Sequence, residues 1–102
     1  MLLDTMHFNQ RVWNLCSKIP KGKVTTYKII ASKLGTKAYR AVGNALKANP
    51  YAPEVPCHRV IKSNGEVGGF ARGTKNKIRL LKKEGVKIKD NKIKKKFISS
   101  FS

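Results

Sequence analysis

The sequence predicts a mostly α-helical domain with small β-hairpins, built as a helix-turn-helix, winged-helix-like arrangement of three to four helices. Two short helical patterns joined by a glycine-containing turn predict the helix-turn-helix, and the Asn64-Gly65 pair predicts a hairpin. The chain has 102 residues, 40% of them hydrophobic. We therefore expect one domain over residues 1–102, with its core at about 4–85 and a basic tail at 86–102.

The first helix is predicted from about Asp4 to Lys18, with Asp4 or Thr5 available to cap its start. An apolar stripe at helical spacing comprises Phe8, Val12, Leu15, Cys16 and Ile19. Cys16 lies on this stripe, which predicts a buried and unreactive thiol.

Two further helices form the predicted helix-turn-helix. The first begins after Thr25 or Thr26 as N-cap and ends at Gly35. The second spans Ala38 to Asn49, where Pro50 stops it. The residues expected to face inward are Tyr27, Ile30, Ala31, Leu34, Ala38, Val42, Ala45 and Leu46.

Prolines at positions 50, 53 and 56 predict an extended loop that leads to Cys57. The following segment, from His58 to Gly69, is expected to form two short strands around the Asn-Gly turn.

A further helix is expected from Thr74, its cap, to Gly85, its terminator, with Ile78 and Leu81 inward. The tail alternates apolar residues with lysines around Asp90-Asn91, which predicts a small hairpin before a frayed basic end.

Charge limits the classes of partner. There are 23 Lys and Arg residues against five Asp and Glu, a net charge of +18. Such a field favours a polyanion, with nucleic acid first and an anionic membrane surface second. The alternative is a surface merely solvated by lysines, although acidic residues are then normally interspersed. Lys37 and Arg40, at the start of the second helix of the helix-turn-helix, suit phosphate contacts.

The absence of certain sequence features predicts the cellular compartment and the metal content of the protein. It has neither an apolar run that could span a bilayer nor an N-terminal signal segment, so we expect a cytoplasmic, nucleoid-associated protein. Its two cysteines make no disulfide framework, and two histidines without a C-x-x-C pair predict no zinc site.

Gly43 lies inside a predicted helix, where glycine costs about 1 kcal/mol relative to alanine. Its presence indicates close approach of another backbone or of a ligand, either DNA or a packed helix.

Cys57 stands between a proline and a histidine, and its thiol needs help to ionise because a free thiol has a pKa of about 8.5. Neighbours on an extended chain point to opposite sides, so a Cys57–His58 pair requires a turn or a bridging water. A histidine base also needs an orienting group. Glu84 is a candidate, since the helix dipole disfavours an acid there. Its alternative role is a surface ion pair with lysines, and Glu54 is expected to be solvated.

The segments "VTTYKIIA", "RAVGNALKANP", "VPCHRVI", "NGEVGG" and "LLKKEG" occur in this order between about Phe8 and Gly85. Together they resemble the O6-alkylguanine-DNA alkyltransferase (methylated-DNA–protein-cysteine methyltransferase) family, specifically its C-terminal catalytic and DNA-binding domain. The resemblance favours the catalytic reading of Glu84 over the surface one.

The resemblance implies DNA repair by direct damage reversal, in which a methyl or alkyl group passes from O6-alkylguanine to Cys57 in a single turnover. His58 would act as base through a water, with Glu84 orienting it. Tyr27 would donate a proton to the departing guanine, and Asn49 would brace the loop that carries Cys57.

The implied partner is double-stranded DNA bound through its minor groove, with the damaged base flipped out. Arg40 would fill the vacated space, and Ala41 and Gly43 would permit close approach. The expected DNA contacts are Lys37, Tyr39, Arg40, Ala41 and Gly43. The expected pocket residues are Pro56, Val60, Gly69, Phe70, Ala71 and Lys77. We expect no cofactor, no metal and no membrane contact, and a monomer.

Three features depart from the family pattern. Phe70-Ala71 stands where Tyr-Ser is frequent, which leaves backbone N–H groups to bind the guanine oxygen. Tyr39 is bulkier than the small residue frequent before the arginine. The family's amino-terminal domain, where a zinc can reside, is not expected in this chain, which is either a natural single-domain form or a fragment.

Three alternatives stay open from the sequence. A binding module that recognises alkyl damage without repairing it resembles this chain but lacks the acceptor cysteine. A winged-helix regulator gives no reason for the Pro-Cys-His-Arg segment, Tyr27 or Glu84. A cysteine hydrolase needs a second histidine downstream, whereas His7 lies on the first helix.

Overall fold

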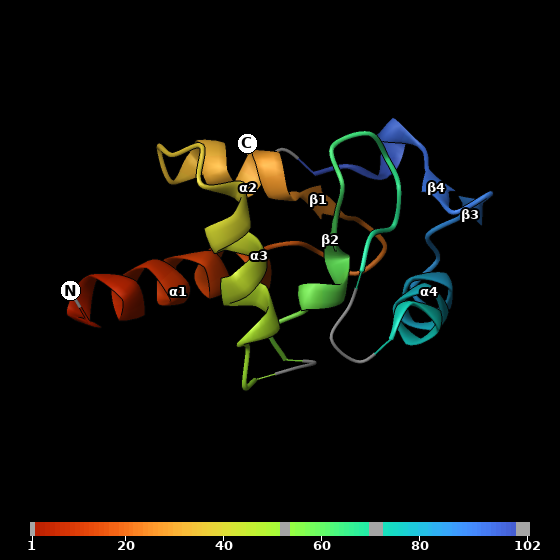
Figure 1. Cartoon of the computed structure of the whole chain (residues 1–102). Coiled ribbons are helices and arrows are strands. Elements are labelled where there is room, and N and C mark those ends of the chain that lie inside the picture. Colours follow the sequence, from red (N-terminus) through yellow and green to blue (C-terminus); the bar gives the residue numbers. More distant parts are fainter. Residues whose placement is uncertain (1, 52–53, 70–72, 100–102) are drawn as a thin grey trace.

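The computed structural model describes residues 2–51, 54–69 and 73–99. Within them lie four α-helices, four two-residue strands and two 3₁₀ turns (Figure 1). In chain order these are α1 (Leu2–Ser17), β1 (Thr25–Thr26), α2 (Tyr27–Lys33), α3 (Tyr39–Lys47), η1 (Cys57–Arg59), β2 (Val60–Ile61), α4 (Thr74–Lys83), β3 (Ile88–Lys89), β4 (Lys92–Ile93) and η2 (Lys95–Phe97). The predicted mostly α-helical class is confirmed. No helix of the described residues has the length and apolar character needed to cross a membrane.

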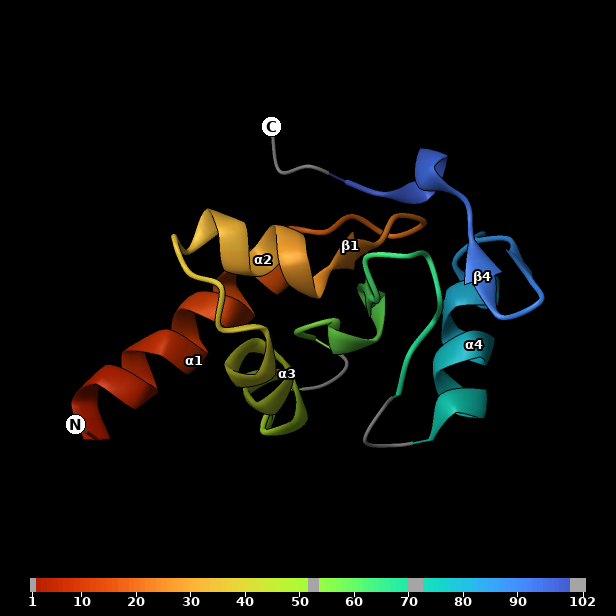
Figure 2. The same cartoon turned by 45° about the horizontal axis from the view of Figure 1, so that its top comes forward.

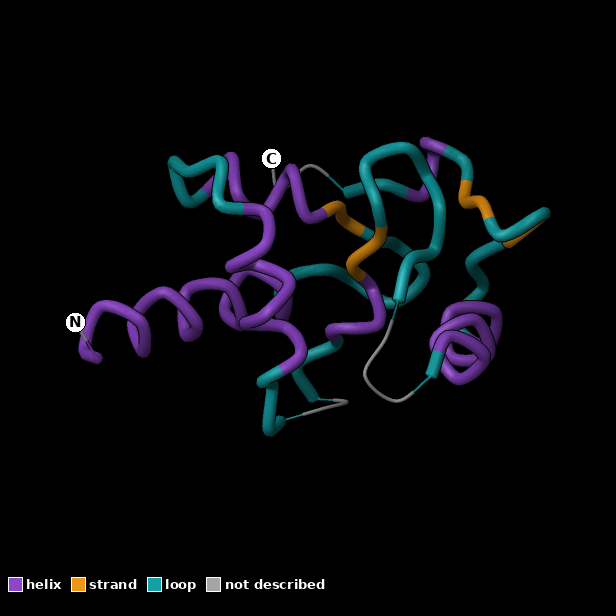
Figure 3. The backbone as a smooth tube through the Cα atoms, in the orientation of Figure 1, coloured by secondary structure: helices purple, strands orange, loops and turns teal. Residues whose placement is uncertain are grey.

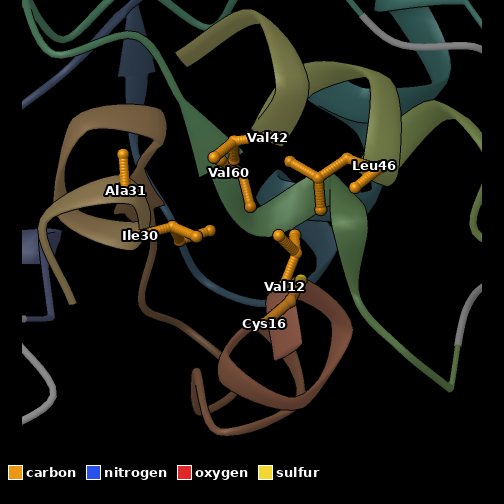
Figure 4. Close-up of a cluster of buried hydrophobic side chains, with 8 residues drawn as sticks. Val12, Cys16, Ile30, Ala31, Val42, Leu46 and Val60 are labelled. Atoms are coloured by element: carbon orange, nitrogen blue, oxygen red, sulfur yellow. The ribbon is translucent and has the colours of Figure 1, made fainter. Parts of the chain in front are cut away.

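Helices α1, α2 and α3 enclose the main core at one end of the molecule. Its buried side chains are Val12, Cys16, Ile30, Ala31, Val42, Ala45, Leu46 and Val60 (Figure 4). Removing this apolar surface from water is the main force that holds the three helices together. Trp13 adds a polar link, because its indole N–H donates to the carbonyl of Ala45 over 2.8 Å. Cys16 is fully buried, as its place on the apolar stripe predicted.

A second core joins the opposite end to the tail. It comprises Val24, Ile61, Val67, Leu81, Val86 and Ile93. Helix α4 and the β3–β4 hairpin lie at this end, and the β1–β2 pair lies between the two cores (Figures 1 and 3). The hairpin turns at Asp90 and Asn91, both with positive φ, which confirms the predicted turn.

The basic end is ordered up to Ser99, so the prediction that it frays is wrong for the described residues. Val24 N–H donates to the carbonyl of Phe97 over 2.8 Å, and Ser99 N–H donates to the carbonyl of Val24 over 2.7 Å. These bonds continue the small parallel arrangement with a bridge between Val24 and Ile98. Backbone pairing with a distant segment therefore holds a stretch whose local composition favours disorder.

The predicted two-stranded hairpin over His58–Gly69 is wrong in its pairing. The turn forms, with Gly65 N–H donating to the carbonyl of Lys62 over 3.0 Å. Strand β2, however, pairs in parallel with β1, with Thr25 opposite Val60. The segment after the turn instead uses the tail, because Val67 N–H donates to the carbonyl of Asn91 over 3.0 Å. The segment after the turn thus forms backbone hydrogen bonds with the tail, where the sequence predicted bonds with the strand before the turn.

Helix ends agree only in part with the sequence. Helix α1 begins at Leu2, so Asp4 and Thr5 lie inside it rather than capping its start, and α3 ends at Lys47 rather than at Asn49. Thr26 caps α2, its hydroxyl oxygen accepting from Ile29 N–H over 3.0 Å. Thr74 is not a cap: it is the first residue of α4, and Gly73 (φ 96°) precedes it as N-cap. Ala38 is exposed rather than inward. It is the N-cap of α3, and its backbone angles (φ −79°, ψ 64°) are not helical.

Candidate active site

One cavity of about 730 Å³ opens beside the exposed face of α3. The described residues that line it are Tyr27, Tyr39, Arg40, Gly43, Leu46, Lys47, Cys57, Lys62 and Gly69. Figure 2 shows how these elements meet, with the segment that follows Cys57 lying between α3 and α4. Three of the lining side chains are cationic, and none of the described ones is acidic. The cavity therefore suits an anionic or polar ligand that rests partly on apolar surface.

Cys57 reaches this cavity because the chain turns at that point. It is the first residue of η1, is half-buried, and donates its N–H to the carbonyl of Val55 over 2.8 Å. Asn49 braces the same loop: its side-chain amide donates to the carbonyl of Val55 over 2.8 Å, and its side-chain oxygen accepts from Tyr51 N–H over 2.9 Å. Between them these bonds hold the two ends of the 49–55 segment together. The middle of that loop, residues 52–53, lies outside the described residues.

The 3₁₀ turn also directs His58 away from the cavity opening and toward Glu84. His58 is 3% exposed, and its Nε2 lies 3.1 Å from each carboxylate oxygen of Glu84. A carboxylate can only accept, so Nε2 carries the proton and Nδ1 is left as an acceptor. Burial lowers the pKa of His58, against the opposing effect of the Glu84 hydrogen bond and charge. The imidazole is therefore neutral near pH 7 and able to take up a proton.

Arg59 completes the Glu84 site, and sequence reasoning missed this role. Its Nε donates to Glu84 Oε1 over 2.9 Å and its Nη2 to Oε2 over 2.6 Å, while Nη1 donates to the carbonyl of Ile19 over 2.7 Å. Burial acts to raise the pKa of Glu84, but the hydrogen bonds from Arg59 and His58 outweigh it and hold that pKa below its usual value. In the sequence, the indication of this role is the position of the arginine directly after His58.

Glu84 thus stays ionised at the end of α4, where the helix dipole alone would disfavour a negative charge. The bidentate arginine fork and the imidazole N–H supply the compensating positive charge. This geometry is unlike a solvated surface pair of Glu84 with lysines, because the described partners are the two residues that follow Cys57.

Tyr27, the first residue of α2, presents its ring to the cavity that also holds Cys57. Burial, and then the negative charge that Cys57 carries as thiolate, raise the pKa of the Tyr27 phenol. The phenol is therefore protonated at neutral pH and able to donate. Its hydroxyl lies near the Gly68 backbone, where an added Cβ would stand 3.9 Å from it.

Lys77 lies behind the cavity wall rather than on it. The side chain is 1% exposed, and its ammonium donates to the carbonyl of Val60 over 2.7 Å and to that of Gly69 over 3.2 Å. Burial lowers its pKa to about 8, while the thiolate charge of Cys57 acts in the opposite direction. The ammonium therefore ties strand β2 to the glycine loop that lines the cavity.

Of the predicted DNA-contact residues, Tyr39, Arg40 and Gly43 of α3 line the cavity, whereas Lys37, which precedes α3, and Ala41 do not. Lys37, Tyr39 and Arg40 are exposed, and Ala41 and Gly43 are half-buried. Among the described residues, no atom lies within 4 Å of where a Cβ on Gly43 would stand. A packed helix is therefore not what the glycine accommodates, and the position borders the open cavity instead.

The predicted pocket residues do not all line the cavity. Val60 is a buried core residue that contributes its backbone carbonyl to Lys77, and Pro56 is buried. Gly69 lines the cavity. Phe70 and Ala71 lie outside the described residues. In the part of the chain that the structure describes, no three His, Cys, Asp or Glu side chains gather as a metal site would require.

Comparison with known proteins points to one family. Residues 7–86 match the model of the 6-O-methylguanine DNA methyltransferase, DNA binding domain. The chain is 55% identical over 86 residues to the methylated-DNA–protein-cysteine methyltransferase of Saccharolobus solfataricus, a match that covers 84% of this chain and 56% of that protein. The chain therefore spans little more than half the length of such relatives.

Two solved structures are similar as well. The Mycobacterium tuberculosis OGT in complex with DNA is 45% identical, with a TM-score of 0.73 over 76% of this chain and 48% of that one. The Schizosaccharomyces pombe Atl1 in complex with damaged DNA containing O6-carboxymethylguanine is 31% identical, with a TM-score of 0.82 over 91% of this chain and 94% of that one.

Proposed function

Because the chain belongs to the 6-O-methylguanine DNA methyltransferase family, we propose that it repairs DNA by moving an alkyl group from O6 of guanine to Cys57. The observation that carries the proposal is the placing of Cys57 in the cavity of α3, next to a neutral His58 that Glu84 holds by hydrogen bonds. The reaction uses each molecule once, because the thioether formed on Cys57 is chemically stable and keeps the alkyl group.

Activation of the thiol begins at His58. Nε2 donates to Glu84, so Nδ1 is the ring atom that can accept the proton of Cys57. Cys57 Sγ makes no direct hydrogen bond to His58 within the described part of the chain, which fits a relay through one water molecule. Arg59 keeps Glu84 ionised, and the ionised carboxylate stabilises the imidazolium that forms.

The transfer is an in-line displacement. The thiolate forms a bond to the alkyl carbon as the bond from that carbon to O6 breaks, and the electron pair stays on guanine. Tyr27 donates its phenolic proton to the departing guanine, and His58 returns the proton from Cys57 to the tyrosinate through solvent. The net products are a thioether on Cys57 and unmodified guanine in the DNA.

Access to O6 requires that the base leave the stack, which costs a few kcal/mol. Helix α3 would lie in the minor groove, where Arg40 fills the vacated space and Gly43 lets the helix backbone approach. The cationic lining of the cavity favours the phosphates on either side of the flipped nucleotide. We propose a monomer that acts on double-stranded DNA in the cytoplasm, at the nucleoid, without a cofactor.

A second candidate is a module that binds alkylated DNA without repairing it. Its support is the similarity to Atl1 over nearly the whole length of both chains. The presence of Cys57 in the cavity favours transfer over binding alone.

The deciding experiment incubates the protein with duplex DNA containing O6-methylguanine and weighs the intact protein. We expect a mass gain of one methyl group, located by fragmentation on the peptide that bears Cys57. Cys57→Ala should lose the gain and keep DNA binding. Cys16→Ala is the matched control and should keep both, because burial raises the pKa of the Cys16 thiol to about 12. An unchanged mass in a folded, DNA-bound protein would favour the binding module.

A further inference from the structure

The tail hairpin places two like charges opposite each other. The register of β3 and β4 sets Lys89 directly opposite Lys92, next to the apolar pair of Ile88 and Ile93. Like charges directly opposite on neighbouring strands destabilise an antiparallel pair. A glutamate at either position would turn the repulsion into attraction, yet the sequence keeps two cations.

One acid lies beside the pair: Glu66 forms an isolated antiparallel bridge with Lys92, but its carboxylate accepts from the Asn64 side chain and forms no described ion pair with a lysine. The exposed lysines of the tail are Lys87, Lys89, Lys92, Lys94, Lys95 and Lys96. Among the described residues, the salt bridges all belong to Glu84, which lies in the active site. The nearest acid in sequence, Asp90, is exposed in the hairpin turn and forms no described ion pair. Six exposed lysines against Asp90 and Glu66 leave the hairpin and its surroundings with an excess of positive charge.

These lysines occupy fixed positions relative to the cavity. Ile93 N–H donates to the carbonyl of Gly65 over 2.8 Å, and Val67 N–H donates to the carbonyl of Asn91 over 3.0 Å. Both bonds attach the hairpin to the turn that begins at Lys62, whose side chain lines the cavity with Cys57. Figures 1 and 2 both show the hairpin beside this turn and α4. Cationic residues thus lie both at the cavity, in Lys62, and on the hairpin that is bonded to the turn after Lys62.

We propose that Lys89, Lys92 and Lys94 bind phosphates of the DNA duplex outside the damaged nucleotide, and so extend the DNA-binding surface beyond α3. This proposal rests on the proposed function for the identity of the polyanion. The three residues lie beyond residues 7–86, which match the family model. DNA phosphates between or beside Lys89 and Lys92 would remove the repulsion that the free hairpin bears.

The test is the salt dependence of binding to an undamaged duplex of about 24 base pairs, which at about 3.4 Å per base pair exceeds the 41 Å length of the protein. Each phosphate contact contributes about 0.9 to the slope of log K against log salt concentration. For the triple variant K89Q/K92Q/K94Q we expect the slope to fall by about 2 to 3. The control R11Q/K18Q/K21Q removes the same charge from exposed sites on α1 and the loop after it, and its slope should stay within about 1 of the wild type.

Two further measurements separate a loss of phosphate contacts from a loss of folding. The free triple variant should melt at or above the wild-type temperature, since the Lys89–Lys92 repulsion is gone, and K89R/K92R/K94R should retain the wild-type slope. Equal slope losses in the tail variant and the control would show only a general field effect and overturn the proposal. So would an unchanged slope with loss of binding to phosphatidylserine vesicles, which would assign the surface to a membrane.

The proposed transfer reaction is separable from this test. At low salt, with saturating O6-methylguanine duplex, the tail variant should still gain one methyl on Cys57. A wild-type protein that shows the salt slope but no mass gain would refute the transfer reaction and leave the tail surface intact.

Discussion

His58 Nε2 lies 3.1 Å from each carboxylate oxygen of Glu84, although the two residues are 26 positions apart in the chain. The contact joins the 3₁₀ turn that begins at Cys57 to the C-cap residue of α4 and leaves His58 Nδ1 as the basic atom.

Glu84→Gln should slow methyl transfer at least about tenfold while DNA affinity changes by less than about twofold. The amide no longer stabilises the imidazolium or favours one tautomer. Single-turnover transfer rates and DNA titrations measure the two effects. Glu66→Gln is the control, because it makes the same charge change at an acid whose described side-chain partner is Asn64 of its own turn. Equal losses of transfer and affinity in Glu84→Gln would assign the residue a structural role instead.

Transfer by the wild-type protein should depend on pH through His58. Burial lowers its pKa below the ordinary 6.5, so the base remains neutral as the pH falls through 6.5 and is protonated only at lower pH. Glu84 contributes stabilisation of the protonated form, so in Glu84→Gln this decline should move to still lower pH. Transfer rates measured from about pH 5 to 8 give both profiles. A decline above pH 6.5 would contradict the assignment of His58 as the base.

Arg59→Lys should lower stability by about 2 kcal/mol, because lysine keeps the charge but cannot bond Glu84 in a fork and the carbonyl of Ile19 together. Thermal unfolding measures the loss. Arg79→Lys on the exposed side of α4 is the matched control and should be nearly neutral. If the two variants unfold alike, the described fork contributes little.

Tyr27→Phe should slow transfer by about tenfold or more and leave DNA affinity within about twofold, since only the proton donor is removed. Burial raises the pKa of the phenol, so the wild-type donor should survive to pH values above 10. The comparison is with Tyr51→Phe, which removes an exposed hydroxyl from a ring packed edge-on against Trp13. Full transfer by Tyr27→Phe would remove the phenol from the mechanism.

Comparing Lys77→Met with the wild type should show how the buried ammonium of Lys77 makes the unfolding free energy depend on pH. The native lysine has a pKa of about 8 and the unfolded one about 10.5. Between these values the unfolded chain keeps the proton and the native chain has lost it, so the wild-type unfolding free energy rises with pH relative to the variant. The relative gain should reach about 3 kcal/mol by pH 10.5. Denaturant melts across this range measure it, and Lys75→Met, at an exposed site, should show no such trend.

Gly43→Ala should stabilise the free protein by about 0.5–1 kcal/mol, because the position is helical and no described atom lies within 4 Å of the new Cβ. The same methyl should weaken DNA binding if the helix backbone meets the groove there. Asn14→Ala, at an exposed position of α1, should bring a similar helical gain with unchanged affinity. Unchanged DNA affinity in Gly43→Ala would show that the groove does not reach this glycine.

The local features of this fold could be predicted from the sequence alone. Apolar spacing placed all four helices and the burial of Cys16, a threonine marked the start of α2, and Asp90-Asn91 marked the tail hairpin. Each depends on a few residues close together in the chain, so side-chain period and turn preference are enough to predict it. The motifs around Cys57 and Glu84 also predicted the family that the comparisons show.

Tertiary structure decided the pairing of β2 with β1, the role of Arg59, the burial of Lys77 and the docking of the tail. None of these has a local signature. The sequence of an amphipathic helix predicts that its lysines are exposed to solvent. Lys77 is buried because the folded chain places the carbonyls of Val60 and Gly69 within hydrogen-bond distance of its ammonium. A buried charge or a two-residue strand is stable only with its partners in place, and those partners come from segments distant in sequence.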